Sequence, residues 1–575
     1  MLIKSYNQKK KEEEKVRIDM AIIRITSRNQ FEQYREEWSL ILEENQNTNP
    51  FIEFDWVNEW WKHLGKDFKI EIMAVRQGNE VIAFFPFTYK KNFLGYTYNF
   101  MAFGQANYMD FIVSENWLED TSKFVLDEII QRRKNVVFYL HGLLESGKTP
   151  ASLEQYLQSQ GSKFSVHRII TPYIDLDKIK LDKYMKKRKK LHRLDRREKR
   201  LHENGKVEML RSSPEEMDYM FQLHDKRWKK KRDTSGFTNE KEREFFRSLA
   251  EIQQGPLKTE IDSLYINDTM IAFNYGFNCR GKFLGYVLGY DDDFETFSPG
   301  RILEKEKILL CKYGHEHVFD LSIGYETYKF DWNTHLDYTR RMIFSSNRMK
   351  AKIKRQFLSK KEFLVERIKK NHKIVLFKRN TIGKLFFVLR NLFRAESKET
   401  RTELAELMTR IRKYLYENER YIVYKMEKND VPELPESEQF VELTINDAME
   451  CPTIAGKKMK EVCRKMYGGY KGYYPVGRLS FENIFWTNEK VLRIDRISYL
   501  EQFHKSSIYF KNWNEGNLSD VCSAVKRSSK ARTVYVTVED GAKSEMALLE
   551  ETGFSVSKHI FKRTYFGFGK YQITE

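Results

Sequence analysis

The chain has 575 residues, of which 101 are Lys or Arg and 82 are Asp or Glu, so its formal charge is +19 at pH 7. This length exceeds what one hydrophobic core can organise and predicts about three domains. With 41% hydrophobic residues, 14% aromatic residues and only 11 prolines, the composition excludes a disordered chain.

The compartment is predicted from what the sequence lacks. No segment approaches the ~20 apolar residues of a membrane-spanning helix. Residues 1–20 form a polar leader where a signal peptide would need an apolar core. The five cysteines are widely spaced and include no CxxC pair, which favours free thiols. We therefore expect a cytoplasmic protein, either free or peripheral to the inner face of the membrane.

Two segments hold the whole excess of positive charge. Lys180 to Lys206 contain 13 basic and 4 acidic residues, and Lys350 to Arg394 contain 15 and 2. Their net charges are +9 and +13, which leaves the remaining chain near neutral at −3. Such localised charge indicates an anionic partner or surface, or else solvated helix faces between domains.

The first predicted lobe covers residues 21–178. Strand-like runs at 70–75, 81–89 and 135–140 alternate with helical segments, which is typical of an α/β layer. The first amphipathic helix is predicted at 51–65, with Phe54, Val57, Trp61 and Leu64 on one face and Gly65 at its end.

The second predicted lobe covers residues 179–345. It opens with a basic amphipathic helix at 184–205, in which Leu191, Leu194 and Leu201 repeat at helical spacing. A helix at 217–230 follows, then strands within 263–278 and 281–291, a helix from Ser298 and a strand at 317–324. The turns between the strands are expected at residues 267–268 and 280–281.

A basic connector is predicted at 346–400 and a third α/β lobe at 401–575. Apolar clusters in the connector are interrupted by Lys378, Arg379, Lys384 and Arg390, which fits a surface-seeking amphipathic segment or a helical linker packed on a lobe. Strands of the third lobe are expected at 421–427, 481–487, 505–513 and 532–539, before a helix at 543–554.

A resemblance to a known family rests on residues 290–332. This run has a Tyr-Asp after a strand, Ser-Pro-Gly opening a helix, a Phe-Asp-Leu strand and a Gly-x-Glu-x-Tyr-Lys ending before Trp332. It resembles the acetyltransferase domain of bacterial cellulose and exopolysaccharide biosynthesis, within the GNAT superfamily. The runs KKRKKLHRLDRREKRLHENGKVEM, LHDKRW and FIEFDWVNEWWKHLG are also similar to that family, so the resemblance spans Phe51 to Trp332.

The resemblance implies a fold of the α/β class, with tandem GNAT-like mixed-sheet lobes like those of the Fem-type aminoacyltransferases. The C-terminal run SEMALLEETGFSVSKHIFKRTYF resembles the closing helix and strand of an ordinary GNAT domain, so a third C-terminal GNAT-like lobe is expected. The Arg/Gln-x-x-Gly-x-Gly/Ala loop of such a domain is absent there, and residues 510–525, FKNWNEGNLSDVCSAV, take its place, which is the pattern of a degenerate lobe.

The resemblance also implies an acyl-CoA, such as acetyl-CoA, as acyl donor. A pyrophosphate needs donors at a helix N-terminus, and Ser298, Pro299, Gly300 and Arg301 suit a capped helix start with a close backbone approach and a forked cation. Without the family resemblance, the same motif is an ordinary helix start. The pantetheine is expected along the strand that ends in Gly289 and Tyr290. Gly285 and Gly289 mark either a bulge or poor strand formers.

Acyl transfer needs a base for the acceptor and a proton donor for the leaving thiolate. Glu326 or Asp320 could serve as base, Tyr328 as proton donor, and Lys329 as a charge that orients the acceptor or stabilises the oxyanion. The competing interpretation makes Asp320 structural, Tyr328 a core residue and Lys329 a solvated charge.

Acceptor-binding candidates lie on the helix at 217–230. His224, Arg227 and Trp228 combine an aromatic face with a forked cation, which suits a sugar or an anionic acceptor, unless they are simply a half-buried helix face. No cluster has the spacing of metal ligands, so no metal is expected.

Three functions are compatible with these features. The first is an acyl-CoA-dependent N- or O-acyltransferase acting on an amino sugar, a glycan or another surface-polymer precursor. The second is a Fem-like transferase that takes an aminoacyl group from tRNA, whose phosphates the lysine-rich helix would contact. The third is a non-catalytic partner of a membrane polysaccharide synthase, docked through the basic segments.

Overall fold

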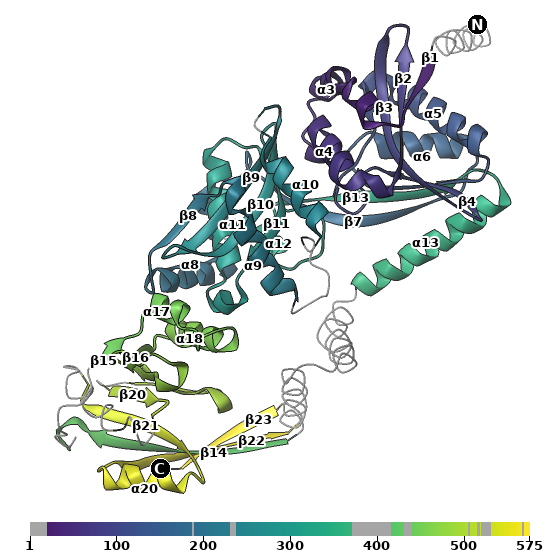
Figure 1. The fold of residues 1–575 in the computed structure, drawn as a ribbon. Coiled ribbons are helices and arrows are strands. Elements are labelled where there is room, and N and C mark those ends of the chain that lie inside the picture. The colour runs from purple at the N-terminus through teal and green to yellow at the C-terminus, as the bar shows by residue number, and fades with distance from the viewer. Residues whose placement is uncertain are drawn as a thin grey trace.

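The structure is a computed structural model in which three lobes follow one another along the chain (Figure 1). It describes residues 20–186, 189–229, 237, 239–252, 254–370, 416–430, 440–503, 507–513, 518, 531–565 and 568–574. Residues 1–19 of the expected leader and 371–400 of the expected connector lie outside the described residues. Within the described part, no helix is long and apolar enough to cross a membrane.

The first lobe is an α/β layer, as the alternating pattern predicts. Its strands are β1 (Met20–Ile25), β2 (Lys69–Gln77), β3 (Glu80–Asn92), β4 (Gly95–Phe100), β5 (Ile112–Val113), β6 (Val136–Leu144) and β7 (Phe164–Asp175). Its helices are α2 (Arg28–Glu32), α3 (Arg35–Glu44), α4 (Phe54–Leu64), α5 (Leu118–Arg133) and α6 (Thr149–Ser159).

The second lobe contains the predicted helices and hairpins. Its strands are β8 (Val207–Arg211), β9 (Leu257–Ile266), β10 (Thr269–Cys279), β11 (Lys282–Tyr290), β12 (Val318–Asp320) and β13 (His335–Ser345). Its helices are α7 (Leu181–Lys186), α8 (Lys189–His202), α9 (Met217–Lys229), α10 (Glu240–Ala250), α11 (Pro299–Tyr313) and α12 (Lys329–Trp332). Both predicted turns are confirmed, and all four of their residues have positive φ, as two-residue hairpins require.

The first two lobes share one sheet of 13 strands because they exchange strands. Twelve of these strands follow the order β1-β2-β3-β4-β6-β13-β7-β12-β11-β10-β9-β8, and β5 pairs with β3 beside this path. Strand β13, which ends the second lobe, pairs with β6 of the first lobe. Strand β7, which ends the first lobe, pairs with β12 of the second. Neither lobe therefore completes its sheet without the other.

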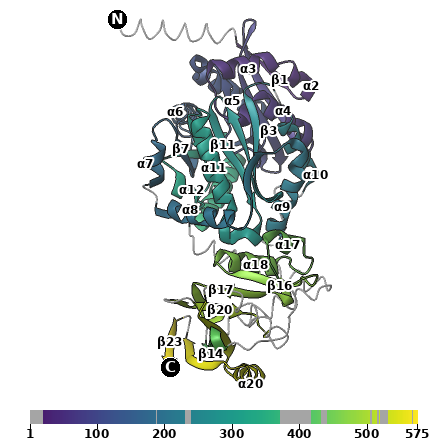
Figure 2. The ribbon, with the colours of Figure 1, turned by 90° about the vertical axis from the view of Figure 1, so that its left-hand side faces the viewer.

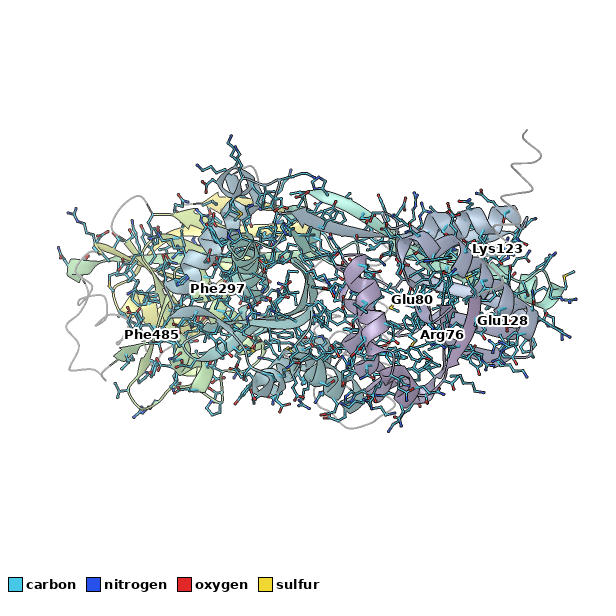
Figure 3. All side chains as sticks on the ribbon, turned by 90° about the horizontal axis from the view of Figure 1, so that it is seen from above. Arg76, Glu80, Lys123, Glu128, Phe297 and Phe485 are labelled. Atoms are coloured by element: carbon cyan, nitrogen blue, oxygen red, sulfur yellow. The ribbon has the colours of Figure 1, made fainter. Side chains whose placement is uncertain are left out.

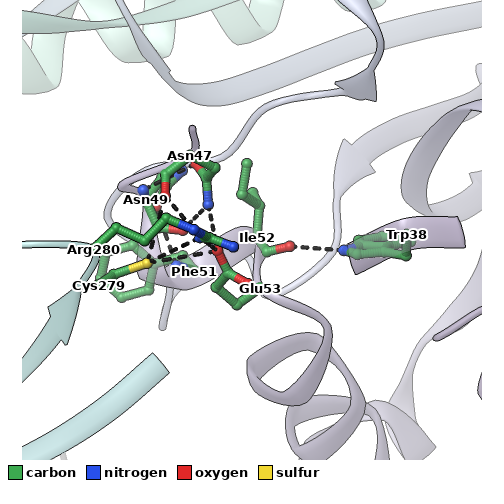
Figure 4. A network of polar contacts seen from close by, with 8 residues as sticks. All are labelled: Trp38, Asn47, Asn49, Phe51, Ile52, Glu53, Cys279 and Arg280. Atoms are coloured by element: carbon green, nitrogen blue, oxygen red, sulfur yellow. Dashed lines mark hydrogen bonds and ion pairs between the residues drawn. The ribbon is translucent and has the colours of Figure 1, made fainter. Parts of the chain in front are cut away.

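A polar network joins the two lobes at a second place (Figure 4). The Arg280 guanidinium donates to the carboxylate of Glu53 and, at 2.8 Å, to the carbonyl of Asn47. The thiol of Cys279 lies 3.5 Å from the same carboxylate, and Asn47 Nδ2 donates to it at 2.7 Å. Glu53 is buried, so these donors compensate a charge that would otherwise be costly.

Helix α4 ends before Gly65, as predicted, but its buried face is wider than the sequence suggests. Trp56 and Trp60 are fully buried although they lie off the predicted face, whereas Trp61 is half-buried. The reason is that α10 of the second lobe packs on α4, with the rings of Trp56 and Phe245 in edge contact at 5.3 Å.

The third lobe has a separate sheet of eight strands, ordered β15-β16-β17-β20-β21-β14-β22-β23. Its strands are β14 (Tyr416–Glu427), β15 (Phe440–Glu442), β16 (Lys471–Pro475), β17 (Phe485–Asn488), β20 (Ser507–Lys511), β21 (Thr533–Glu539), β22 (Ser555–Tyr565) and β23 (Phe568–Thr574). A small hairpin of β18 (Val491–Ile494) and β19 (Tyr499–Gln502) and helices α17 (Ile445–Glu450), α18 (Lys457–Tyr467) and α20 (Lys543–Glu551) complete it.

The third lobe lies against the end of the second lobe that carries α8 (Figures 1 and 2). Helix α18 packs on η5 (Asp292–Phe297), the turn between β11 and α11, and Phe297 meets Tyr467 edge-on at 5.7 Å. Figure 3 shows the resulting elongation of the molecule: Phe297 and Phe485 lie toward one end, and Arg76, Glu80, Lys123 and Glu128 of the first lobe toward the other.

Helix α13 (Met349–Lys370) begins the segment predicted as a connector and lies on the first lobe. It contacts β6, β13 and β7, and Ala351 is fully buried there with Tyr139 and Ile343. The packed-linker interpretation is thus confirmed for one face of this helix.

The inter-lobe network gives a stability prediction. We expect Glu53→Gln to lower the free energy of unfolding by ~2 kcal/mol or more, because it leaves the Arg280 guanidinium without its buried counter-charge. Glu32→Gln is the matched control, since it breaks the exposed ion pair with Arg28 and should cost less than ~1 kcal/mol. Denaturant unfolding followed by circular dichroism measures both, and equal effects would contradict a central role for Glu53.

Candidate active site

The sheet opens between β11 and β12. These parallel strands pair only at Lys282–Leu284 with Val318–Asp320. Beyond Asp320 the chain follows β7 instead, since the N–H groups of Leu321 and Gly324 donate to carbonyls of β7 at 3.0 Å. Residues 285–290 of β11 therefore pair with β10 on one edge only, and their other edge is left unpaired by β12. Such an edge can pair with an extended ligand.

A β-bulge lies at the point of divergence. Gly276 of β10 faces Gly285 while Tyr275 faces Val287, so Tyr286 is the extra residue. This supports the bulge interpretation of Gly285. Gly289 has a different reason to be glycine: a Cβ there would come within 2.2 Å of the Phe273 ring across the hairpin.

Helix α11 begins beside the open strand, as predicted, with Pro299 at its first position. The expected capping by Ser298 is wrong. Ser298 adopts a left-handed conformation with φ 60°, and its side chain makes no capping bond. Its carbonyl accepts instead from the N–H groups of Arg301 and Ile302. The helix start therefore offers fewer free backbone donors than expected. A Cβ at Gly300 would lie 3.0 Å from the ring of Tyr290.

Two arginines stand at this helix start. Arg301 donates to Asp331 at 2.9 Å, and its Nε and Nη2 atoms are buried without a hydrogen-bond partner among the described residues. Arg197, on the basic helix α8, donates to the hydroxyl of Ser298. The cationic groups that a phosphate could meet here come from side chains of two helices.

Asp320 ends β12 at the divergence and is almost fully buried. Its carboxylate accepts from the Tyr108 hydroxyl at 2.8 Å and from the backbone N–H of Ser322 at 2.7 Å. Lys282 Nζ lies 2.9 Å from its second oxygen. Burial and the Asp320 charge raise the pKa of Tyr108 well above its usual value. Three donors thus fix Asp320, which suits a positioning role better than proton uptake.

The other catalytic candidates lie in the turn after β12. The Glu326 side chain is more than half exposed, and its carboxylate lies 3.2 Å from Lys329 Nζ. Lys329 is buried rather than solvated, and it donates to the carbonyl of Ile323 at 2.6 Å. Tyr328 is the N-cap residue of α12 and packs half-buried against the core that the second and third lobes share. Glu326 is therefore the candidate most able to exchange a proton with solvent.

The acceptor candidates on α9 are placed only in part. His224 is buried, with its ring 4.7 Å from that of Phe237 in an edge contact. The side chains of Arg227 and Trp228 lie outside the described residues. Lys226, between these candidates, pairs with Asp291 and Asp293 at 2.7 and 2.8 Å and so ties α9 to the turn before α11.

Sequence reasoning missed several polar residues of this region. Tyr108 comes from the first lobe, more than 200 positions from Asp320, so no local pattern reveals the pair. Arg197 lies on the predicted basic helix, whose pattern does not distinguish it from the other basic residues there. Glu304 on α11 is buried, and burial raises its pKa to about 7 despite the opposing charge of Arg301.

The part of the chain that the structure describes contains neither a disulfide nor a candidate metal site. The four cysteines placed there, Cys279, Cys311, Cys451 and Cys463, are unpaired and buried. No group of three or more His, Cys, Asp or Glu side chains is arranged to hold a metal ion in this part of the chain.

Comparison with known proteins gives one family match. Residues 186–330 match the family described as acetyltransferase (GNAT) domain. This range contains β11, β12 and α11, whose arrangement is described above. No curated protein matches the sequence.

Several solved structures are similar in fold. The C-terminal DUF2156 domain of an Agrobacterium fabrum protein has 13% identity and a TM-score of 0.37, over 56% of this chain and 94% of that one. FemX has 12% identity and a TM-score of 0.36, over 49% and 90%. A tandem GNAT protein of clavulanic acid biosynthesis has 9% identity and a TM-score of 0.35, over 56% and 98%. The family match identifies residues 186–330 as a GNAT-superfamily acetyltransferase domain, which makes the chain an enzyme of the acyltransferase class.

Proposed function

We propose that the second lobe transfers an acyl group from an acyl-CoA to an amine or hydroxyl of a small or glycan acceptor. The observation that carries this proposal is the divergence of β11 and β12 beside the start of α11, within the range that matches the acetyltransferase family. An open strand edge next to a helix N-terminus can hold a pantetheine amide chain and a pyrophosphate at the same time.

The residues present fit such a donor. The edge of residues 285–289 that β12 does not pair offers backbone groups to the amides of a pantetheine. Gly300 leaves room at the helix start, and Arg197 and Arg301 supply positive charge there. Because Arg forks bind phosphate oxygens in pairs, these two side chains would hold the pyrophosphate more firmly than the few free backbone donors.

The chemistry assigned to the chain is proton transfer and orientation. As the acceptor nitrogen or oxygen forms its bond to the acyl carbon, Glu326 takes its proton. The carbon–sulfur bond breaks, and Tyr328 is the candidate that returns a proton to the thiolate. Lys329, buried under the same turn, holds the turn in place through the Ile323 carbonyl and pairs with Glu326. Asp320 and Tyr108 fix the end of β12 against the first lobe.

The acceptor we propose is an amino sugar, a glycan or another surface-polymer precursor, by analogy with the exopolysaccharide acetyltransferases that residues 51–332 resemble. A Fem-like use of aminoacyl-tRNA is the alternative, and copurification of ribonuclease-sensitive RNA without acetyl-CoA binding would favour it. A non-catalytic partner of a polysaccharide synthase would bind the donor or the synthase without turnover.

The third lobe, whose sheet also has one parallel pair (β20–β21), is proposed to be GNAT-like.

The helix start gives the first test of this function. We expect Gly300→Asp to weaken acetyl-CoA binding by at least ~2 kcal/mol, because a carboxylate there would crowd Tyr290 and repel the pyrophosphate. Gly300→Ala is the matched control: it adds the Cβ without the charge and should cost clearly less. Calorimetric titration measures both, and wild-type affinity in folded Gly300→Asp protein would overturn the assignment.

The base assignment gives the second test. Glu326→Gln should keep acetyl-CoA binding and lower the rate of acyl transfer by ~100-fold or more, because the amide cannot take up the proton. Steady-state turnover as a function of pH measures this. Asp320→Asn serves as comparison and should lower stability as well as rate, since Asp320 joins two lobes. Wild-type rates for Glu326→Gln at every pH would remove Glu326 from the mechanism.

A further inference from the structure

The third lobe contains a cavity of about 280 Å³ between α18, the β18–β19 hairpin and the end of β20. Five cationic side chains line it but only two carboxylates do. The cationic residues are Arg464, Lys465, Arg493, Arg496 and Lys511. This cavity lies in a lobe that the acetyltransferase match does not reach.

The two carboxylates of the cavity are already engaged. Asp495 pairs with Lys511 and, at 2.8 Å, with Arg493 Nε, so one carboxylate serves two cations. Glu461 lies 3.0 Å from Lys465 Nζ. Arg496 points to Glu419 and Glu539, outside the cavity lining, at 2.9 and 3.1 Å. The lining therefore keeps an excess of positive charge.

Two buried polar groups of the cavity have no hydrogen bond to any described residue. Lys465 is 4% exposed and Tyr470 is 6% exposed, and neither Lys465 Nζ nor the Tyr470 hydroxyl finds a hydrogen-bond partner there. The contact of Lys465 with Glu461 is close enough for an ion pair, but it lacks hydrogen-bond geometry. Burial lowers the pKa of Lys465 because the charged ammonium loses its hydration there. A bound anion would stabilise the charged form.

We propose that this cavity binds a small phosphate ester or diphosphate. Arg forks and Lys point charges together match phosphate oxygens, and the Tyr470 hydroxyl offers a further donor. The volume of about 280 Å³ lies just below the ~300–1,000 Å³ usual for small-molecule sites. It suits a phosphorylated sugar or an inorganic diphosphate better than a whole coenzyme A. The site lies outside the matched acetyltransferase domain, so the proposal does not depend on the function proposed above.

Calorimetric titration of the full chain with inorganic pyrophosphate tests this site. We expect saturable binding that Arg493→Gln and Lys511→Gln each weaken by ~10-fold or more, while acetyl-CoA affinity stays at the wild-type value. Lys458→Gln is the matched control, because Lys458 is on α18, pairs with Glu482 and does not line the cavity. Absence of pyrophosphate binding, unchanged affinity in both variants, or full competition by acetyl-CoA would each overturn the proposal.

A second inference rests on a different surface, the outer face of α13. The inner face of this helix packs on the first lobe, and both of its glutamates point that way. Glu362 accepts from Tyr139 at 2.7 Å and pairs with Arg341, and Glu366 lies 3.3 Å from His167. The outer face therefore carries no carboxylate of this helix.

The outer face combines exposed apolar side chains with cations. Phe357 and Phe363 are 68% and 61% exposed, although aromatic side chains are normally buried. The exposed apolar residues are Met349, Ile353, Phe357, Phe363 and Leu364. At helical spacing they form one stripe. The exposed cations on the same outer surface are Lys350, Lys352, Lys360, Lys361 and Arg367.

We infer that this face of α13 lies on an anionic lipid surface. Aromatic and aliphatic side chains enter the interface while the lysines and arginine meet the headgroups, an attraction that is strongest at low salt. The charge is of one sign, which complements anionic lipid. A protein partner of mixed charge would leave these cations unmatched.

Sedimentation with vesicles tests the surface. Vesicles of equal parts phosphatidylcholine and phosphatidylglycerol should sediment the full chain at low salt, and high salt should release it. The double variant Phe357→Ser with Phe363→Ser should lose at least ~10-fold in partition. Tyr219→Ser, at an exposed aromatic on α9, is the matched control and should bind normally. Equal binding to pure phosphatidylcholine, unchanged binding of the double variant, or protein left in the supernatant would each contradict the inference.

Discussion

The exchange of β7 and β13 is the constraint on which the first two lobes depend. Each strand completes the sheet of the other lobe, so the order β6-β13-β7-β12 cannot form from either lobe alone. The candidate site also depends on both lobes. Tyr108 of the first lobe donates a hydrogen bond to Asp320, and the Gln105 carbonyl of the first lobe accepts one from the Tyr286 hydroxyl. A change in the first lobe can therefore alter chemistry that the second lobe performs.

The same exchange explains why β11 has an open edge. Strand β7 draws the chain after Asp320 away from β11, so the parallel pairing stops after three residues. The bulge at Tyr286 adds local twist at that place. Helix α18 of the third lobe packs on the turn that leads from β11 into α11, and Lys460 pairs with Glu295 there. A ligand in the third-lobe cavity would contact α18, the helix that packs on the turn before α11.

Much of the fold followed from local signals in the sequence. Hairpin turns at 267–268 and 280–281, the end of α4 at Gly65 and the start of α11 at Pro299 are each set by one or two residues. The strand exchange could not be predicted, because it depends on which of several similar strands pair. For the same reason the Asp320–Tyr108 contact and the second buried face of α4 were missed. The prediction that Ser298 caps α11 was wrong because serine is a common N-cap residue, but the left-handed backbone of Ser298 leaves its side chain without a capping hydrogen bond.

The central claim is that an acyl-CoA lies along the open edge of β11. Hydrogen–deuterium exchange of the full chain with and without acetyl-CoA tests it most directly, since a pantetheine paired with the strand would cover its backbone amides. We predict slower exchange for amides of residues 285–290, and no comparable change when inorganic pyrophosphate is added alone. Saturating acetyl-CoA that leaves exchange in this strand unchanged would contradict the account.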